Sequence, residues 1–185
     1  MHKKNILSIG NRDRFGALID MRNYKICAEI GVEYGNFSES ILKSDIDKLY
    51  LIDCWKSQLN YNDMCNRDQE KQDEIYAKVV EKFSDNNRVS IIRDYSLDAC
   101  RMFNDKYFDF VYLDSDHSYD HVKLELRKWY KKVKDGGMLA GHDYFDGIVN
   151  GTTFGVKKAV DEFIEEKDKL LFVLDEQFPS WFIIK

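Results

Sequence analysis

Short apolar runs alternate along the chain with longer segments whose apolar residues recur every three or four positions. The short runs are almost continuously apolar, as in strands that are buried on both faces of a parallel sheet. The pattern predicts strands at 25–32, 49–55, 88–96, 108–114 and 136–144, and a closing pair at 170–176 and 181–185 that is joined across Pro179.

Between these runs the apolar period changes to that of a helix. In 69–83, for example, Ile75, Val79 and Phe83 follow one another at a spacing of four and define one apolar face. Segments 57–68 and 145–155 are expected to be loops, the second a mobile one because it contains three glycines. Strands that alternate with helices imply an α/β fold with a mainly parallel sheet that is covered on both faces. The other helices are predicted at 15–21, 96–103, 118–133 and 155–167. One more is predicted after Gly35, with Phe37, Ile41 and Leu42 on one face.

The length of 185 residues suits a single domain, 1–185, with 1–24 as an N-terminal cap segment and 57–87 as a loop–helix insertion between the second and third strands. No apolar run approaches the roughly 20 residues that cross a bilayer, and the first ten residues lack the pattern of a signal peptide. We therefore expect no membrane partner. The four cysteines show no C-x-x-C spacing, so we expect a reduced, cytoplasmic protein. A net charge of -5 argues against a nucleic-acid partner. A homo-oligomer is compatible with this composition.

A glycine turn follows the first predicted strand, in the pattern E-x-G-x-x-x-G formed by Glu29, Gly31 and Gly35. Glycine lets the backbone approach a ligand closely because it has no Cβ and tolerates positive φ. The dinucleotide fingerprint is G-x-G-x-x-G, and Glu33 would repel a pyrophosphate at this turn, which disfavours an NAD-dependent reductase. A ligand without phosphates is preferred, and Glu29 could hold a cationic ammonium group. The alternative is an ordinary turn between a strand and a helix.

Two further strand ends carry polar side chains that suit a nucleoside. Asp53 ends the second strand about 20 residues after the glycine turn, where an acid can accept both hydroxyls of a ribose. Asp94 and Ser96 end the third strand, where they could meet the edge of an adenine. The alternative for Asp53 is a turn or capping acid, and for Asp94 and Ser96 it is the N-cap of the next helix.

Acids and histidines follow the fourth and fifth predicted strands. Asp114, Asp116 and His117 come after the fourth strand, and His142 and Asp143 come after the fifth. Parallel pairing of these strands brings both clusters to the edge of the sheet where open α/β sheets bind ligands.

In this order, the segments AEIGVEYGNFS, YLIDCW, RDYS, FDFVYLDSDHSYDHVKLELRKW, KDGGMLAGHDY and GVKKAVDEF resemble the motifs of class I S-adenosylmethionine-dependent methyltransferases. The chain is most similar to methyltransferase family 24, which is related to the macrocin-type O-methyltransferases, and the resemblance covers roughly residues 25–165. It implies a Rossmann-like seven-strand sheet of order 3-2-1-4-5-7-6 with strand 7 antiparallel. It also implies S-adenosylmethionine as cofactor, with its methionine part at Glu29, Gly31 and Gly35, its ribose at Asp53, and its adenine near Asp94 and Ser96.

By the same resemblance, Asp114 would bind a divalent cation and His117 would be the general base. The relatives carry two consecutive acids after the fifth strand, whereas this chain has His142 and Asp143. A metal site of Asp114, His142 and Asp143 would suit Mn²⁺, Fe²⁺ or Zn²⁺ better than Mg²⁺, because imidazole prefers the later transition metals.

The residues themselves support part of this assignment. Methyl transfer is an in-line displacement, so the acceptor must be aligned and must lose a proton, a task that suits a neutral histidine near pH 7. The alternatives are that His117 caps the following helix, that His121 is a solvated residue on the same helix face, and that Asp116 is a capping acid.

The sequence therefore predicts an S-adenosylmethionine-dependent methyltransferase. Its most favoured reaction is O-methylation of a small hydroxylated acceptor such as a sugar or glycan precursor, with a divalent metal as a further expectation. Segments 57–68 and 145–155 would choose the acceptor. The competing hypothesis is a non-catalytic nucleoside-binding or scaffolding module that retains the fold.

Overall fold

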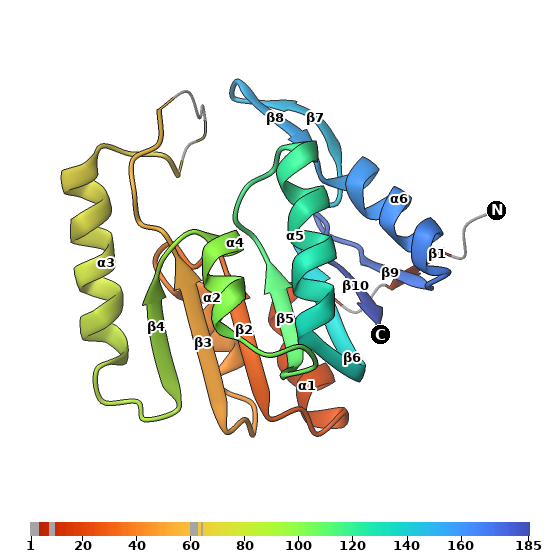
Figure 1. Ribbon diagram of the computed structural model, residues 1–185, viewed down its shortest axis with the longest axis horizontal. Coiled ribbons are helices and arrows are strands. Elements are labelled where there is room, and N and C mark those ends of the chain that lie inside the picture. The colour runs from red at the N-terminus through yellow and green to blue at the C-terminus, as the bar shows by residue number, and fades with distance from the viewer. Residues whose placement is uncertain (1–3, 8–9, 60–62, 64) are drawn as a thin grey trace.

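A computed structural model describes residues 4–7, 10–59, 63 and 65–185. Within these residues, eight strands form one sheet in the order β1-β9-β10-β6-β5-β2-β3-β4 (Figure 1). The strands are β1 (Lys4–Leu7), β2 (Ile26–Ile30), β3 (Lys48–Asp53), β4 (Val89–Arg93), β5 (Phe108–Leu113), β6 (Val133–Gly141), β9 (Leu171–Leu174) and β10 (Trp181–Ile184).

The predicted sheet is confirmed. Taken without β1, the strands run β4-β3-β2-β5-β6-β10-β9, which is the order 3-2-1-4-5-7-6. The pairs among β4, β3, β2, β5 and β6 are parallel, and β10 is antiparallel to both β6 and β9. The strand β1 was not predicted, and it adds to the edge of the sheet parallel to β9. It escapes a search for periodicity because it is four residues long and is held by backbone pairing at an edge.

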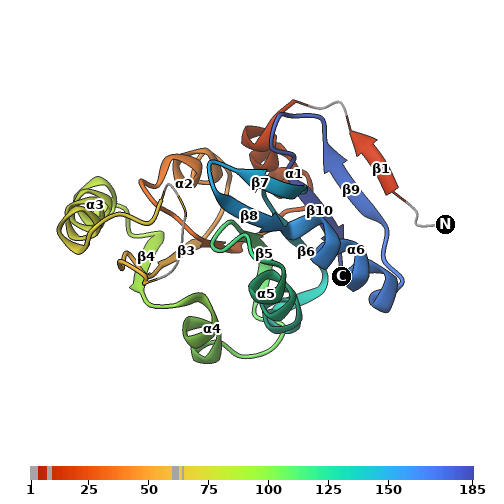
Figure 2. The ribbon, with the colours of Figure 1, turned by 90° about the horizontal axis from the view of Figure 1, so that it is seen from above.

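Helices cover both faces of the sheet, as Figure 2 shows. On one face lie α1 (Phe15–Met21), α2 (Asn36–Ile41) and α3 (Gln69–Phe83), and on the other α4 (Ser96–Ala99), α5 (Tyr119–Lys132) and α6 (Val156–Lys167). Two short 3₁₀ helices, η1 (Arg12–Arg14) and η2 (Cys100–Met102), adjoin α1 and α4. The alternation of side chains in a strand fills both cores: Leu49 and Leu51 of β3 pack on the first side, and Ile52 packs on the second.

The segment 145–155 is not the loop that we predicted. Its residues form the hairpin of β7 (Asp146–Val149) and β8 (Thr152–Gly155), in which Val149 pairs with Thr152. The two residues at the turn, Asn150 and Gly151, both have positive φ (51° and 85°). Such a two-residue Asn-Gly turn matches the twist of a hairpin, and this signal outweighs the glycine content on which the loop prediction rested.

The strands β3, β4 and β5 point toward one end of the molecule. The hairpin β7–β8 and the described part of the chain between β3 and α3 both lie above this end in Figure 1. The carboxyl ends of the parallel strands are therefore flanked by two connecting segments, and the candidate site lies between them. In the described part of the chain, no helix has the length and apolar character needed to cross a membrane.

Candidate active site

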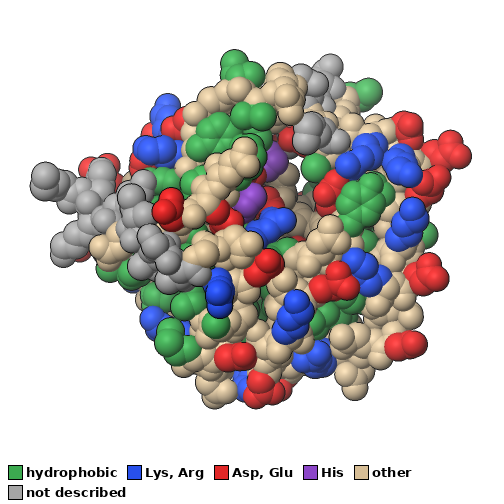
Figure 3. Space-filling model, turned by 180° about the vertical axis from the view of Figure 1, so that it is seen from behind, with side chains coloured by type: hydrophobic (Ala, Val, Ile, Leu, Met, Phe, Trp, Pro, Cys, Tyr) green, Lys and Arg blue, Asp and Glu red, His purple; other side chains and the backbone are tan. Residues whose placement is uncertain are grey.

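A cavity of about 310 Å³ lies at the carboxyl ends of β2, β3 and β5. Its lining includes most of the residues that the sequence singled out. They are Glu29, Gly31, Asp53 and Ser96 from the predicted nucleoside site, and Asp114, Asp116, His117, His121, His142 and Asp143 from the acid and histidine clusters. Figure 3 shows histidine side chains on the floor of a hollow on this face, with acidic and hydrophobic side chains nearby.

The glycine turn is built by close packing. Gly31 has φ of +86°, and a Cβ added to it would lie 1.9 Å from the carbonyl oxygen of Asp114. Gly35 has φ of +71°, and a Cβ there would lie 2.7 Å from Cε2 of Phe83. Both positions require glycine because the turn touches the end of β5 on one side and α3 on the other.

Glu29 lies behind this turn and is only 2% exposed. Its Oε2 accepts a hydrogen bond from the Ser38 hydroxyl at 2.5 Å. Burial disfavours the charged carboxylate and raises the pKa of Glu29 to about 8, although the Ser38 hydrogen bond opposes the shift. A cation in the cavity would favour the ionised form.

Asp53 shapes the turn as well as lining the cavity. Its Oδ2 accepts hydrogen bonds from the backbone N–H groups of Val32 (2.8 Å) and Glu33 (2.9 Å), and its Oδ1 accepts one from Trp55 N–H (2.9 Å). Glu33 has φ of +49°, and its side chain forms an ion pair with Arg67 at 2.7 Å. The carboxylate of Asp53 thus fixes the backbone conformation next to its predicted ribose site.

The two residues predicted near adenine lie differently. Ser96 is buried at the cavity, and its Oγ accepts a hydrogen bond from Trp129 Nε1 at 2.9 Å. Asp94 is half-buried, accepts a hydrogen bond from Tyr95 N–H at 2.8 Å, and is not among the described residues that line the cavity. Tyr95 does line the cavity and offers an aromatic ring at this strand end.

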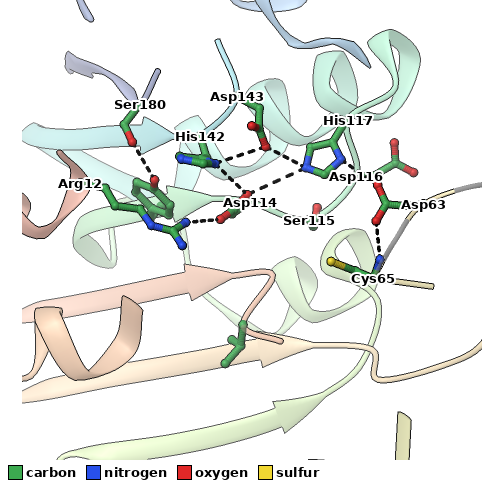
Figure 4. A network of polar contacts seen from close by, with 12 residues as sticks. Arg12, Asp63, Cys65, Asp114, Ser115, Asp116, His117, His142, Asp143 and Ser180 are labelled. Carbon is green, nitrogen blue, oxygen red and sulfur yellow. Dashed lines mark hydrogen bonds and ion pairs between the residues drawn. The ribbon is translucent and has the colours of Figure 1, made fainter. Parts of the chain in front are cut away.

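The acid and histidine clusters meet, as the parallel pairing of β5 and β6 required (Figure 4). Asp114, His117 and Asp143 each offer one ligand atom, and these three atoms lie within 4.8 Å of one another. Asp143 is central, because its Oδ2 is 3.0 Å from His117 Nε2 and 3.3 Å from His142 Nδ1. His142 Nδ1 is also 3.8 Å from Asp114 Oδ1. Asp143 reaches this position with a left-handed backbone conformation, φ +53°.

The electrostatics of this cluster favour positive charge. Burial lowers the pKa of His117, but the neighbouring carboxylates of Asp114, Asp143 and Asp63 outweigh burial and raise it to about 12. For Asp143, burial raises the pKa, but hydrogen bonds from His117 and His142 outweigh burial and hold the pKa well below its usual range. The cluster therefore stabilises a cation at its centre.

Two residues of this network, Asp63 and Arg12, were not predicted from the sequence. Asp63 Oδ2 lies 3.2 Å from His117 Nδ1, and Asp63 Oδ1 accepts a hydrogen bond from Cys65 N–H at 2.7 Å. Arg12 Nη1 lies 2.8 Å from Asp114 Oδ2. These partners are 54 and 102 residues apart in sequence, and no local pattern marks either one.

The hairpin β7–β8 closes over His117. The ring of Phe154 stacks on the imidazole with ring centroids 4.5 Å apart and an interplanar angle of 23°. Gly155 N–H donates to the carbonyl oxygen of His117 at 2.8 Å. Phe145 packs on Phe154 with ring centroids 4.6 Å apart. The second segment that we expected to choose the acceptor thus packs against His117, one of the residues that line the cavity.

Asp116 and His121 have partners of their own. Asp116 Oδ1 accepts a hydrogen bond from Ser118 N–H at 2.7 Å, an Asx turn that leads into α5, whose N-cap residue Ser118 makes no side-chain capping hydrogen bond. His121 Nε2 lies 3.4 Å from Oε1 of Glu125, a carboxylate that is 1% exposed and also accepts a hydrogen bond from the Ser115 hydroxyl at 2.7 Å. His121 is therefore paired with a buried acid rather than simply solvated.

The donor set fits a divalent metal by its chemistry. Two carboxylates and one imidazole suit Mn²⁺, Fe²⁺ or Zn²⁺, and they converge on one point from the segments that follow β5 and β6. The structure groups His117 with the two acids, whereas the sequence prediction placed His142 in this role, and His142 borders the same group through Asp143.

The fold and the arrangement of this cavity define a class I S-adenosylmethionine-dependent methyltransferase. A family model described as a methyltransferase domain matches residues 28–144, more than half of the chain, and the chain belongs to this family, methyltransferase family 24. No curated protein matches the chain in sequence.

Solved structures with the same fold include three named O-methyltransferases. A putative caffeoyl-CoA O-methyltransferase from Staphylococcus aureus is 18% identical with a TM-score of 0.68, and the match covers 94% of this chain and 82% of that one. An O-methyltransferase from Bacillus cereus in complex with SAH is 15% identical with a TM-score of 0.66, covering 94% and 80%. TomG from Streptomyces achromogenes, involved in tomaymycin synthesis and solved with SAM, is 13% identical with a TM-score of 0.64, covering 94% and 79%. At these identities the likeness shows a common fold.

Proposed function

We propose that this methyltransferase transfers the methyl group of S-adenosylmethionine to a hydroxyl oxygen of a small acceptor, such as a sugar or glycan precursor. The observation that carries the proposal is the cluster of Asp114, His117 and Asp143, which lies in the same cavity as Glu29 and Asp53. Carboxylates and histidine at the reacting end suit the deprotonation of a hydroxyl group. The names of three structural neighbours, all O-methyltransferases, support the same type of reaction.

The cofactor would lie along the ends of β2, β3 and β4. Glu29 would hold its ammonium group, and the turn from Gly31 to Gly35 would line its methionine part. Asp53 would accept the ribose hydroxyls with the lone pairs that its three backbone hydrogen bonds leave free. The adenine would lie beside Tyr95 and Ser96, with half-buried Asp94 next to them in the sequence but outside the lining of the cavity.

The acceptor would enter between the hairpin β7–β8 and the described residues of the 57–68 segment. In-line transfer requires the acceptor oxygen, the methyl carbon and the sulfur to be collinear, so the acceptor must be held firmly. Phe154 and Asp63 restrain the ring of His117 from two sides, and His117 Nε2 faces the space between Asp114 and Asp143. From this position His117 would accept the proton of the hydroxyl group after losing its own, because the surrounding carboxylates outweigh burial, raise its pKa and favour the imidazolium form over the neutral ring that we assumed from the sequence.

Asp114, His117 and Asp143, with His142 beside them, are the residues that would hold a divalent metal. When bound, such a metal orients acceptor oxygens and lowers the pKa of a hydroxyl group. Asp114 and Asp143 would supply its carboxylate ligands, and His117 would supply an imidazole ligand or a nitrogen that accepts a proton.

Calorimetry and a transfer assay together test the proposal. The full chain should bind S-adenosylmethionine and its demethylated product, and it should transfer a labelled methyl group to hydroxylated metabolites in an Mn²⁺-containing extract. Binding without transfer to any metabolite would favour the non-catalytic module instead. Absence of binding to both ligands at high micromolar concentration would refute the assignment.

The metal is tested separately by titrating Mn²⁺ into the wild type, Asp143→Asn and Asp120→Asn. Asp120 is the matched control, because it is an exposed acid in the first turn of the neighbouring helix. We expect Asp143→Asn to weaken Mn²⁺ binding by at least about tenfold and Asp120→Asn to leave it unchanged. Equal affinity in all three proteins would exclude metal binding at this cluster.

A further inference from the structure

Arg12 is a cation from the N-terminal segment that reaches the cavity from the side opposite His117 (Figure 4). Its Nη1 lies 2.8 Å from Asp114 Oδ2, and its guanidinium carbon lies 5.2 Å from the centroid of the Phe37 ring. Its side chain is 33% exposed, and it lines the cavity together with Glu29. Phe37 directly precedes Ser38, the residue that donates a hydrogen bond to Glu29. Arg12 therefore belongs to the Glu29 end of the cavity.

The charges along the cavity are unequal. Its lining contains many carboxylates, and Arg12 and Lys56 are the arginine and lysine side chains among the described lining residues. Lys56 lies over the ring of Tyr95, 5.6 Å from its centroid, at the end where the adenine would lie. Arg12 is thus the positively charged side chain that the described lining offers near Glu29.

The amino-acid end of S-adenosylmethionine carries two opposite charges, an α-ammonium and an α-carboxylate. An acid such as Glu29 complements the ammonium group but repels the carboxylate, so the carboxylate needs a donor of opposite charge in the same place. A guanidinium suits this task, because it offers five N–H donors in a planar fork and forms bidentate pairs with carboxylates. One donor of Arg12 is occupied by Asp114, and the fork has others to offer.

We propose that Arg12 binds the α-carboxylate of the methyl donor and, through the same guanidinium, holds Asp114 of the reacting cluster. The proposal rests on the proposed function, since it assigns one group of that cofactor. It makes η1 part of the cofactor pocket and joins the two ends of the reaction, the methionine moiety and the acid beside the acceptor.

The connection between β9 and β10 holds the backbone of Arg12 in this position. The backbone N–H of Arg12 donates to Glu176 Oε2 at 3.3 Å, and Glu176 Oε1 accepts a hydrogen bond from Ser180 N–H at 3.1 Å. The Ser180 hydroxyl in turn forms a hydrogen bond with the hydroxyl of buried Tyr112 at 3.0 Å. The connection between β9 and β10 thus fixes the start of η1 against the end of β5.

The decisive comparison uses two ligands that differ in the carboxylate alone, S-adenosylmethionine and its decarboxylated form. Calorimetry on the full chain measures both for the wild type, Arg12→Gln, Arg12→Lys and Arg14→Gln. Arg14 is the matched control, because it lies in the same 3₁₀ helix and is exposed. We expect the wild type and Arg14→Gln to prefer the carboxylated ligand by at least about tenfold, as for a charge-assisted hydrogen bond.

In Arg12→Gln this preference should vanish or reverse, because the remaining acids favour the more cationic ligand, and Arg12→Lys should show an intermediate preference. If Arg12→Gln does not fold, as judged by circular dichroism, the ratio in Arg12→Lys decides. An unchanged ratio of the two ligand affinities in the folded Arg12 variants overturns the inference. The same holds if an Arg12 variant keeps both ligand affinities and only its KM for the acceptor rises. A wild type that binds neither ligand refutes the proposed function itself, which separates the two failures.

Discussion

Glu29→Gln isolates the cost of burying a carboxyl group behind the glycine turn. Glu29 is 2% exposed and has the Ser38 hydroxyl as its hydrogen-bond donor. A glutamine of the same shape keeps an oxygen that accepts this hydrogen bond and removes only the ability to ionise. The difference in stability between the two proteins therefore reports on the ionisation of Glu29.

The expected magnitude follows from its pKa. Burial raises the pKa of Glu29 from 4.5 to about 8, so the folded state keeps a proton that the unfolded state has released over this range. The unfolded state is favoured more strongly as the pH rises, and the free energy of unfolding of the wild type falls by about 1.4 kcal/mol per pH unit relative to that of the Glu29→Gln variant. Over the full window the loss is of the order of 3–5 kcal/mol. Below pH 4.5 both states are protonated and above about pH 8 both are ionised, so the effect is flat outside the window.

Urea unfolding of the cofactor-free wild type and of Glu29→Gln at several pH values from about 5 to 8 provides the assay. All other titrating groups are common to both proteins, so the stability advantage of the variant should grow with pH while the m-values stay equal. Ser38→Ala removes a hydrogen bond that opposes the shift and should extend the dependence to higher pH. An advantage that stays constant over this range would mean that the folded protein holds Glu29 ionised, and it would refute the reasoning.

Two other predictions concern the turn and the reacting cluster. Gly31→Ala places a Cβ 1.9 Å from the carbonyl oxygen of Asp114 and should lower the free energy of unfolding by about 3 kcal/mol or more, whereas Gly136→Ala, with φ of +78° and no atom within 4 Å of its Cβ, should cost only about 1 kcal/mol in the same urea assay. Equal losses would show that the contact with Asp114 is not what demands glycine. Asp63→Asn removes the charge beside His117 Nδ1 and should lower kcat by about tenfold or more while leaving calorimetric cofactor affinity unchanged. A variant with normal kcat would exclude Asp63 from positioning His117.

Strands and long helices could be predicted because their periodicity is local. The long helix α3 has the predicted bounds 69–83, and the short helix α1, which was predicted from the apolar run FGALIDM and not from a sustained period, has the predicted bounds 15–21. By contrast, β1 is four residues long and depends on pairing with β9, which lies near the other end of the chain. The hairpin β7–β8 carried an Asn-Gly signal at 150–151, but its flanking residues are too polar to alternate clearly.

The same division holds for the site. The meeting of Asp114 with Asp143 could be predicted, because both follow adjacent parallel strands and such ends share one edge. Asp63 and Arg12 could not be predicted, because the first lies in a polar segment and the second in an N-terminal segment without periodicity. Their roles depend on tertiary contacts that bring them to His117 and Asp114.

The glycine turn illustrates how a correct residue can have a different physical reason. We interpreted Gly31 as a residue that admits a ligand, whereas its contact is the backbone of Asp114, whose N–H also donates to the carbonyl oxygen of Ile30 at 2.7 Å. In the proposed arrangement, the turn at the donor end and the acid at the acceptor end would therefore be in direct backbone contact. Because in-line transfer tolerates little displacement between donor and acceptor, we expect this backbone contact to help set their separation. It follows that a larger residue at position 31 would separate the two ends of the reaction even if the protein still folded.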